Sequence, residues 1–376
     1  MAGIYLHIPF CKQACYYCDF HFSTNTEIRK ELLQMMGEEI KLQERYLEGE
    51  SISTIYLGGG TPSLLNPEEI HSLLDSIYKL FIVAAEVEVT LEANPDDLTA
   101  ATLRAFKEVG VNRLSVGVQS FDDNVLKFFN RAHDSKSAID CMGLAREAGF
   151  KNISLDLIYA VPGQGNEQWI RNIQQALALN PEHLSAYSLT IEEKTVFGKW
   201  AAAGRLKSVE DDVSAGQLNT LVDLLEDAGY EHYEVSNFSK PGFYSQHNSS
   251  YWRGKQYLGI GPSAHSYNLI SRQFNVSNNR QYVRSLKEGN VPFALEVLSA
   301  YDHVNEYLMT TLRTKWGCNL QKLKQEFQYN VLSVHESLIS RLLTGGLAVI
   351  EHDHLKLTRA GKLMADKIAA DLFLVP

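Results

Sequence analysis

Three cysteines crowd into eight residues near the start of the chain, in the segment CKQACYYC. The spacing Cys-x3-Cys-x2-Cys places Cys11, Cys15 and Cys18 in one short loop, whereas Cys141 and Cys318 stand alone. Five cysteines do not make a disulfide framework, and clustered thiols in a reducing compartment are typical of metal ligands. Three sulfur ligands can hold one face of a 4Fe-4S cluster and leave its fourth iron open.

An open iron can chelate the amino and carboxylate groups of S-adenosylmethionine (SAM) and bring the sulfonium next to the cluster. Electron transfer would then release methionine and a 5′-deoxyadenosyl radical. The alternatives are a zinc site with His7 or His21 as fourth ligand, a redox pair of Cys15 and Cys18, or structural cysteines. The spacing favours the cluster, because three cysteines in this pattern are more specific than an isolated Cys-x2-Cys.

Glycine and polar residues follow the next β-type runs along the chain. The segment GGGTP at 58–62 predicts a sharp turn with bare backbone, suited to the amino group of a small ligand, although such turns are more often simple connections. Later runs supply an anion for an ammonium, hydrogen-bond partners for ribose hydroxyls and a guanidinium for a carboxylate: Glu92, Gln119, Asp156 and Arg131. Each could be a structural polar group, but together they match the needs of a zwitterionic nucleoside.

A histidine among aromatic residues forms another candidate site. His247 opens the segment HNSSYW and has four Tyr or Trp residues around it between positions 244 and 257. An imidazole among large flat faces could bind the iron of a porphyrin. From the residues alone, a hydrogen-bonded structural histidine is the favoured interpretation, because lone histidines are rarely ligands. The role of His265, in GIGPSAHS, stays open.

A repeated βα pattern must position these side chains. The β-type runs lie at 3–8, 53–58, 86–93, 112–118, 152–158 and 183–189, and they alternate with helical patterns at 26–46, 67–80, 99–108, 135–148 and 167–179. Six such units predict an α/β fold, a partial (βα)6 TIM-like barrel, whose chemistry collects at the carboxyl ends of the strands. Most of the candidate residues fall at those ends.

The pattern changes after residue 190. A helix at 212–228 and a strand at 230–238 extend the predicted sheet, and a stretch rich in Tyr, Gly and Asn then predicts an irregular, substrate-facing connection. Helical spacing followed by two short β-type runs and a final helix predicts a small C-terminal winged-helix-like α+β domain. The predicted domains are therefore 1–238, 239–292 and 293–376. Without a clear basic recognition helix, the last domain is expected to pack on the barrel instead of binding DNA.

Length and composition set further bounds. A chain of 376 residues with 45% apolar residues can form one large domain and a small one, with no long disordered segment. A net charge of −10 argues against nucleic acid as a partner. The start MAGIYLHIPF has no signal-peptide pattern, and no apolar run is long enough for a transmembrane segment, so a cytoplasmic location is expected.

Seven motifs in order resemble the HemW family of heme chaperones, a branch of the radical SAM proteins related to oxygen-independent coproporphyrinogen III oxidase. They are YLHIPFCKQACYYCDF, GGGTPSLL, LEANPD, GVQSF, NRAH, DLIYAVPGQ and HNSSYW. The resemblance covers nearly the whole chain, and the last part is similar to the small terminal domain of the family.

This resemblance implies roles for individual residues. Cys11, Cys15 and Cys18 would hold the cluster, with Tyr5 beside it. The methionine end of SAM would contact Gly59, Gly60, Thr61 and Glu92, and its carboxylate would contact Arg131. The ribose would contact Gln119 and Asp156, and Ser188 would reach the adenosine through its backbone. The histidine implicated in heme binding would be His247.

The function implied is a heme chaperone that binds a 4Fe-4S cluster, SAM and one heme, and delivers heme to an unidentified acceptor protein. A flavodoxin- or ferredoxin-type protein would donate electrons. The alternative is a radical enzyme that oxidatively decarboxylates coproporphyrinogen III. Two departures disfavour it: Phe20 stands where that oxidase has another cysteine, and the first strand begins at residue 3, without the oxidase's longer N-terminal arm. SAM cleavage is expected, and coproporphyrinogen oxidation is not.

Overall fold

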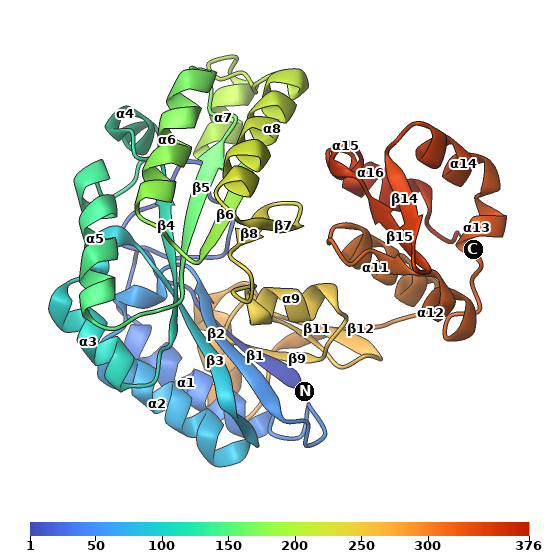
Figure 1. The fold of residues 1–376 in the computed structure, drawn as a ribbon. Helices are drawn as coiled ribbons and strands as arrows, with labels where there is room; N and C mark the ends of the chain where they lie inside the picture. Colours follow the sequence, from blue (N-terminus) through green and yellow to red (C-terminus); the bar gives the residue numbers. More distant parts are fainter. Residues whose placement is uncertain (376) are drawn as a thin grey trace.

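The computed structural model of the chain describes residues 1–375, and six parallel strands form its centre (Figure 1). They are β1 (Ala2–Ile8), β2 (Ile52–Gly59), β3 (Val83–Ala93), β4 (Arg113–Gln119), β5 (Ile153–Tyr159) and β6 (His183–Ser188). Each pairs in parallel with the next along the chain. This arrangement confirms the predicted partial (βα)6 barrel.

Helices cover the outer face of the curved sheet (Figure 1). They are α1 (Arg29–Leu42), α2 (Pro67–Leu80), α3 (Ala100–Glu108), α5 (Ser135–Glu147), α6 (Asn166–Ala178) and α8 (Asp211–Asp227). Capping boxes at Asn66 and Thr99 fix the starts of α2 and α3. The short helices α4 (Asp123–Phe128) and α7 (Val196–Ala202) were not predicted, because six or seven residues give little periodic signal.

The segment 239–292 is regular, so the prediction of an irregular connection was wrong. It contains α9 (Gln246–Trp252), β9 (Tyr257–Ile260), β10 (His265–Tyr267), β11 (Ser271–Asn275) and α10 (Asn279–Lys287). The strand β9 pairs in parallel with β1, and β10, β11 and β12 (Phe293–Val297) follow as antiparallel neighbours. These strands are three to five residues long and partly polar, which hides their period.

The predicted strand at 230–238 is instead a hairpin of β7 (Glu231–Glu234) and β8 (Asn237–Ser239), with β8 antiparallel to β6. The complete order is β12-β11-β10-β9-β1-β2-β3-β4-β5-β6-β8-β7. The sheet therefore runs through Val297, five residues into the segment that the sequence assigned to the terminal domain.

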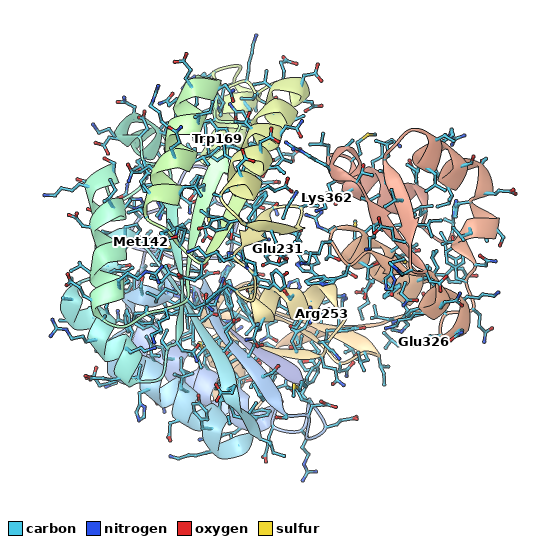
Figure 2. The ribbon with its side chains drawn as sticks, viewed as in Figure 1. Met142, Trp169, Glu231, Arg253, Glu326 and Lys362 are labelled. Atoms are coloured by element: carbon cyan, nitrogen blue, oxygen red, sulfur yellow. The ribbon has the colours of Figure 1, made fainter. Side chains whose placement is uncertain are left out.

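The main core lies between the sheet and its helices. Its largest fully buried side chain is Trp169 of α6, whose indole Nε1 donates to the carbonyl oxygen of Gln217 at 3.0 Å. Met142 of α5 belongs to the same core; Figure 2 labels both residues. The isolated Cys141 lies beside Met142 in this apolar layer, and burial raises the pKa of its thiol to about 12. It is a core residue.

The C-terminal segment is a separate α+β unit with its own apolar core, as predicted. It contains α11 (Ala300–Leu312), β13 (Cys318–Asn319), α12 (Leu320–Gln325), α13 (Val331–Val334), α14 (Glu336–Thr344), β14 (Ala348–Glu351), β15 (His354–Leu357), α15 (Arg359–Lys362) and α16 (Ala365–Asp371). Its antiparallel sheet has the order β13-β15-β14. The side chain of Cys318 is buried in this core.

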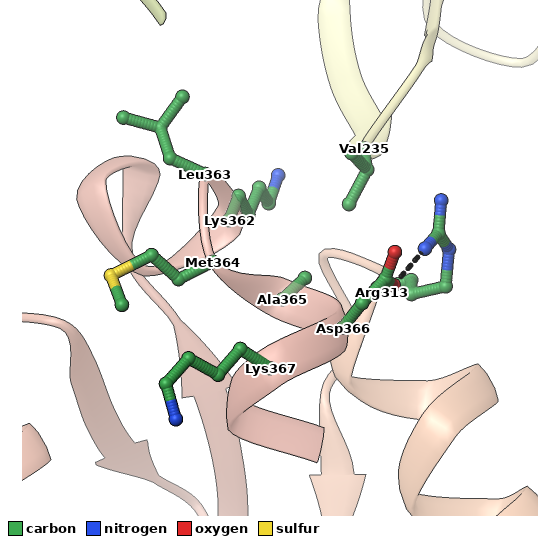
Figure 3. A pocket seen from close by; sticks show the side chains of 8 residues that line it. All are labelled: Val235, Arg313, Lys362, Leu363, Met364, Ala365, Asp366 and Lys367. Atoms are coloured by element: carbon green, nitrogen blue, oxygen red, sulfur yellow. Dashed lines mark hydrogen bonds and ion pairs between the residues drawn. The ribbon is translucent and has the colours of Figure 1, made fainter. Parts of the chain in front are cut away.

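This unit packs on the barrel through polar contacts near β7 and α9. The Arg313 guanidinium is 3.2 Å from the Glu234 carboxylate, and the Arg253 guanidinium lies 4.5 Å from the centre of the Trp316 ring. Lys362 donates to the carbonyl oxygen of His232 at 3.0 Å. Figure 2 labels Glu231, Arg253 and Lys362 at this junction, and Figure 3 shows the small pocket that Val235 and the terminal unit line. Across residues 1–375, every helix is too short or too polar to cross a lipid bilayer.

Candidate functional site

The cysteine loop leaves the carboxyl end of β1 and is held at several points. The amide of Cys11 donates to the carbonyl oxygen of Ser23 at 3.1 Å, and the amide of Cys18 donates to that of Cys15 at 3.3 Å. The amide of Tyr16 donates to the carbonyl oxygen of Phe129, beyond β4, at 3.1 Å. The three thiols are free and partly exposed. The loop therefore presents its sulfur atoms at the end of the barrel where ligands bind.

Two side chains from other strands contact the thiols. The hydroxyl of Thr61 donates to Cys11 Sγ at 3.4 Å, and Arg131 Nη1 lies 3.4 Å from Cys15 Sγ. Burial raises the pKa of Cys11, and it raises the pKa of Cys18 to about 11. Both thiols are therefore protonated at neutral pH, and metal binding must release these protons.

The cysteine loop does not have the ligand arrangement of a single-ion site. A zinc ion needs ligands that converge on one point, about 2.0 to 2.3 Å away. Within residues 1–375, no three His, Cys, Asp or Glu side chains are so arranged. Cubane thiolates bind different irons and surround a volume instead. His7 has both ring nitrogens engaged, with the Tyr5 hydroxyl at 3.1 Å and the His21 carbonyl oxygen at 2.9 Å.

The glycine turn after β2 packs directly against the start of the cysteine loop. The amide of Gly60 donates to the Ile8 carbonyl oxygen at 2.9 Å, and that of Thr61 donates to the Phe10 carbonyl oxygen at 2.7 Å. A Cβ on Gly60 would lie 2.6 Å from the Phe10 carbonyl oxygen, and Gly59 has a φ of +107°. The sequence suggested that the bare backbone serves a ligand, but at Gly60 the chain itself requires it.

Glu92, at the end of β3, is tied to the same turn. The Tyr56 hydroxyl donates to Oε1 at 2.8 Å, and the amide of Gly59 donates to Oε2 at 3.1 Å. Burial raises the pKa of Glu92 to about 7. The carboxyl group is thus poised to lose its proton when a group that donates N–H bonds or carries positive charge binds beside it.

Arg131 joins several elements of the site. Its Nη2 donates to Asn94 Oδ1 at 2.6 Å and to the Gly117 carbonyl oxygen at 2.7 Å, while Nε is buried without a protein partner among the described residues. Asn94 in turn donates to the Thr61 hydroxyl at 3.4 Å. Sequence reasoning missed Asn94, although it lies two residues after Glu92 in LEANP.

Gln119, Asp156 and Ser188 lie on β4, β5 and β6. A Cβ on Gly117 would be 2.9 Å from Gln119 Nε2 and 3.4 Å from Arg131 Nη2, so these two side chains close over the same glycine. Asp156 accepts a bond from the Ser115 hydroxyl at 3.3 Å, and burial raises its pKa. The hydroxyl of Ser188 is 3.2 Å from that of Ser214. Asp156 and Ser188 therefore lie on neighbouring strands and bond to serines.

His247 is a buried, fully hydrogen-bonded imidazole. Its Nδ1 is 2.8 Å from the Thr54 hydroxyl, its Nε2 is 2.7 Å from the Tyr251 hydroxyl, and its ring stacks on Tyr56 with centres 5.0 Å apart. Burial lowers the pKa of His247 to about 3, so the ring is neutral. This is the arrangement that the residues alone favoured. Binding of iron to either nitrogen would break a bond, and the role of His247 in heme binding stays a prediction.

Comparison with known proteins defines the class. Residues 5–176 match the model of the radical SAM superfamily, and residues 298–364 match the HemN C-terminal domain. The solved coproporphyrinogen III oxidase (HemN) from Escherichia coli, described as a radical SAM enzyme, has a TM-score of 0.85 at 24% identity, covering 99% of this chain and 90% of that chain. This likeness shows the fold, and the chain has the fold and cysteine loop of a radical SAM protein.

Curated relatives define the family within this class. The heme chaperone HemW from Bacillus subtilis is 34% identical over 371 residues, which cover 98% of each chain. The heme chaperone HemW from Escherichia coli is 39% identical over 265 residues, or 70% of this chain and 69% of that protein. The chain belongs to the HemW family.

Substitution of Gly60 by alanine should displace the cysteine loop, because the new methyl group meets the backbone of Phe10. We expect Gly60→Ala to bind less iron and sulfide after anaerobic reconstitution. Gly143→Ala is the matched control, because Gly143 lies in α5 with no atom within 4 Å of its Cβ position. Iron and sulfide assays on both variants check this, and wild-type iron content in Gly60→Ala would contradict it.

Proposed function

We propose that this protein is a heme chaperone that binds a 4Fe-4S cluster, SAM and one heme, and passes heme to an acceptor protein. Two hydrogen bonds at the carboxyl ends of the parallel strands carry the proposal. Thr61 donates to Cys11 Sγ, and Arg131 donates to Cys15 Sγ. The heme function follows from relatives that are heme chaperones. The reducing cytoplasm is the proposed location, because the ligands must be free thiols.

Cys11, Cys15 and Cys18 would hold the cluster, with Tyr5 nearby. When bound, the cluster supplies one electron to the sulfonium of SAM, and a flavodoxin- or ferredoxin-type protein would reduce it. Arg131 supports this assignment, because its guanidinium donates to Cys15 Sγ.

The remaining polar residues would bind SAM. Glu92 would accept hydrogen bonds from the amino group of SAM, beside the backbone of Gly59, Gly60 and Thr61. The Nε of Arg131, buried and without a protein partner within residues 1–375, would donate to the carboxylate of SAM. Gln119 and Asp156 would accept the ribose hydroxyls, and Ser188 would contact the adenosine through its backbone. His247 and its HNSSYW segment would contribute to the heme site.

The alternative function is oxidative decarboxylation of coproporphyrinogen III, and one experiment separates the two. Reduced, reconstituted protein is incubated anaerobically with SAM and coproporphyrinogen III, and a second sample is titrated with heme. We expect no protoporphyrinogen by chromatography, and one heme bound per chain by absorbance. Protoporphyrinogen formed in proportion to SAM consumed would contradict the chaperone proposal, as would a lack of saturable heme binding.

Loss of one cysteine ligand should remove the cluster and with it SAM cleavage. We expect Cys15→Ala to lack the brown colour and iron content of the reconstituted protein and to produce no 5′-deoxyadenosine. Cys141→Ala is the control, because Cys141 is buried in the core of α5. Product is measured by chromatography after reduction, and SAM cleavage by Cys15→Ala would contradict the ligand assignment.

SAM binding should weaken as the pH falls through about 7, the pKa of Glu92. The charged carboxylate is the better acceptor for the SAM amino group, and protonation below this pKa removes it. Equilibrium binding, measured about one unit below and one unit above that pKa, should show a smaller pH dependence for Glu92→Gln than for wild type. Proton release by SAM itself affects both proteins alike. Equal pH dependence in the two proteins would contradict this role.

A further inference from the structure

A cavity of about 370 Å³ opens beside the cysteine loop, outside the group of residues assigned to SAM. One wall is formed by Asp19, Phe20 and His21, which directly follow Cys18. The rest of the lining comes from Tyr5 and His7 of β1, Tyr251 of α9, and residues of β9, β10 and the turn between them. The cavity therefore lies between the cluster loop and the HNSSYW segment.

The walls of this cavity offer large flat faces. Phe20 is 72% exposed at its rim, which is unusual for a phenylalanine in a folded chain. Tyr251 and Tyr257 pack edge to face within it, with ring centres 4.5 Å apart at 76°. Aromatic faces around a concave surface suit a planar, largely apolar ligand.

Among the three imidazoles that line the cavity, His265 is the one whose two ring nitrogens have no hydrogen-bond partner within residues 1–375. Both nitrogens of His7 are engaged, and His21 Nε2 is 2.7 Å from Asn279 Oδ1. An iron ion requires an imidazole nitrogen with a free lone pair. His265 meets this condition at either nitrogen, whereas His21 meets it only at Nδ1 within residues 1–375.

The position of His265 is fixed by its surroundings. Its ring packs edge to face against Phe274, with centres 4.8 Å apart at 83°. Its carbonyl oxygen would be 2.0 Å from a Cβ on Gly259, so β9 and β10 approach more closely than any other residue at 259 would allow. The imidazole is therefore exposed to the cavity but held by rigid neighbours, as an iron ligand must be.

We propose that this cavity receives the heme, that His265 is the protein ligand of its iron, and that His247 supports the site through Tyr251. This inference rests on the proposed function. The hydroxyl of Tyr251 is held 2.7 Å from His247 Nε2, one layer beneath the cavity, and His247 is held in turn by Thr54. His247 is thus a positioning residue that orients an aromatic wall of the heme site.

The cavity has few charged groups. Its lining contains no Lys or Arg side chain, and its one carboxylate, Asp19, is exposed. The guanidinium of Arg272 stands behind one wall, where its Nη1 donates to the hydroxyl of Tyr257 at 3.4 Å. A heme held in the cavity by one imidazole would remain accessible to an acceptor protein.

The test is an anaerobic heme titration of the reconstituted full-length chain, followed by absorbance and electron paramagnetic resonance. We expect His265→Ala to lose about tenfold or more in affinity, because even indirect changes around metal ligands cost that much. It should also lose the spectrum of histidine-bound heme, and added free imidazole should restore that spectrum. His352→Ala, in the exposed turn between β14 and β15, should match wild type.

The positioning residue should behave differently. We expect His247→Ala and Tyr251→Phe to weaken heme binding while the spectrum of histidine-bound heme persists. Iron content and thermal melting confirm that each variant is folded, and His265→Gln replaces His265→Ala if the latter does not fold. An unaltered heme spectrum and affinity in the folded His265 variant overturns this inference, as does loss of the histidine spectrum in His247→Ala alone. Failure of wild type to bind heme overturns the proposed function instead.

Discussion

The close approach of two backbones, at the turn after β2 and the start of the cysteine loop, sets the rest of the site. Gly60 and Thr61 donate to the carbonyl oxygens of Ile8 and Phe10, and only glycine fits at position 60. This contact places the Thr61 hydroxyl on Cys11 and leaves the Gly59 amide on Glu92. The sulfur ligands and the carboxylate assigned to SAM therefore share one rigid support. A cofactor site requires its contacting residues to be held in place before the cofactor binds.

The interior of the barrel holds a buried arginine with free hydrogen-bond donors among the described residues. Arg113 is 1% exposed, and its Nε and Nη1 have no protein partner among the described residues. Burial raises the pKa values of Glu88, Glu92 and Asp156, while the charge of Arg113 opposes the rise in each. Buried donors without protein partners, such as those of Arg113, reduce stability, and perturbed pKa values are frequent at functional sites.

The sequence allowed prediction of the six parallel strands and most of their helices, because each βα unit has a clear period and several helices have strong caps. The cysteine spacing predicted a cluster held by Cys11, Cys15 and Cys18, and this assignment stays a prediction. The sequence did not reveal β9 to β12, which are short and stabilised by pairing with β1 and each other, or Asn94, whose role depends on contacts with Thr61 and Arg131. The nitrogens of His247 bond to Thr54, far away in sequence, and to Tyr251, four residues on, while those of His265 have no partner within residues 1–375. Only the folded structure distinguishes these two histidines.

The chain of hydrogen bonds from Tyr251 through His247 to Thr54 ends on β2, the strand that carries the glycine turn. Any molecule that pulls Tyr251 from His247 leaves a buried nitrogen unpaired, at a cost of about 1 to 3 kcal/mol. Ligand binding in the cavity that Tyr251 and His265 line would then be linked thermodynamically to ligand binding inside the barrel. Such linkage is reciprocal. If a ligand in the cavity changes the affinity for a ligand at the strand ends, the second ligand changes the affinity of the cavity by the same factor.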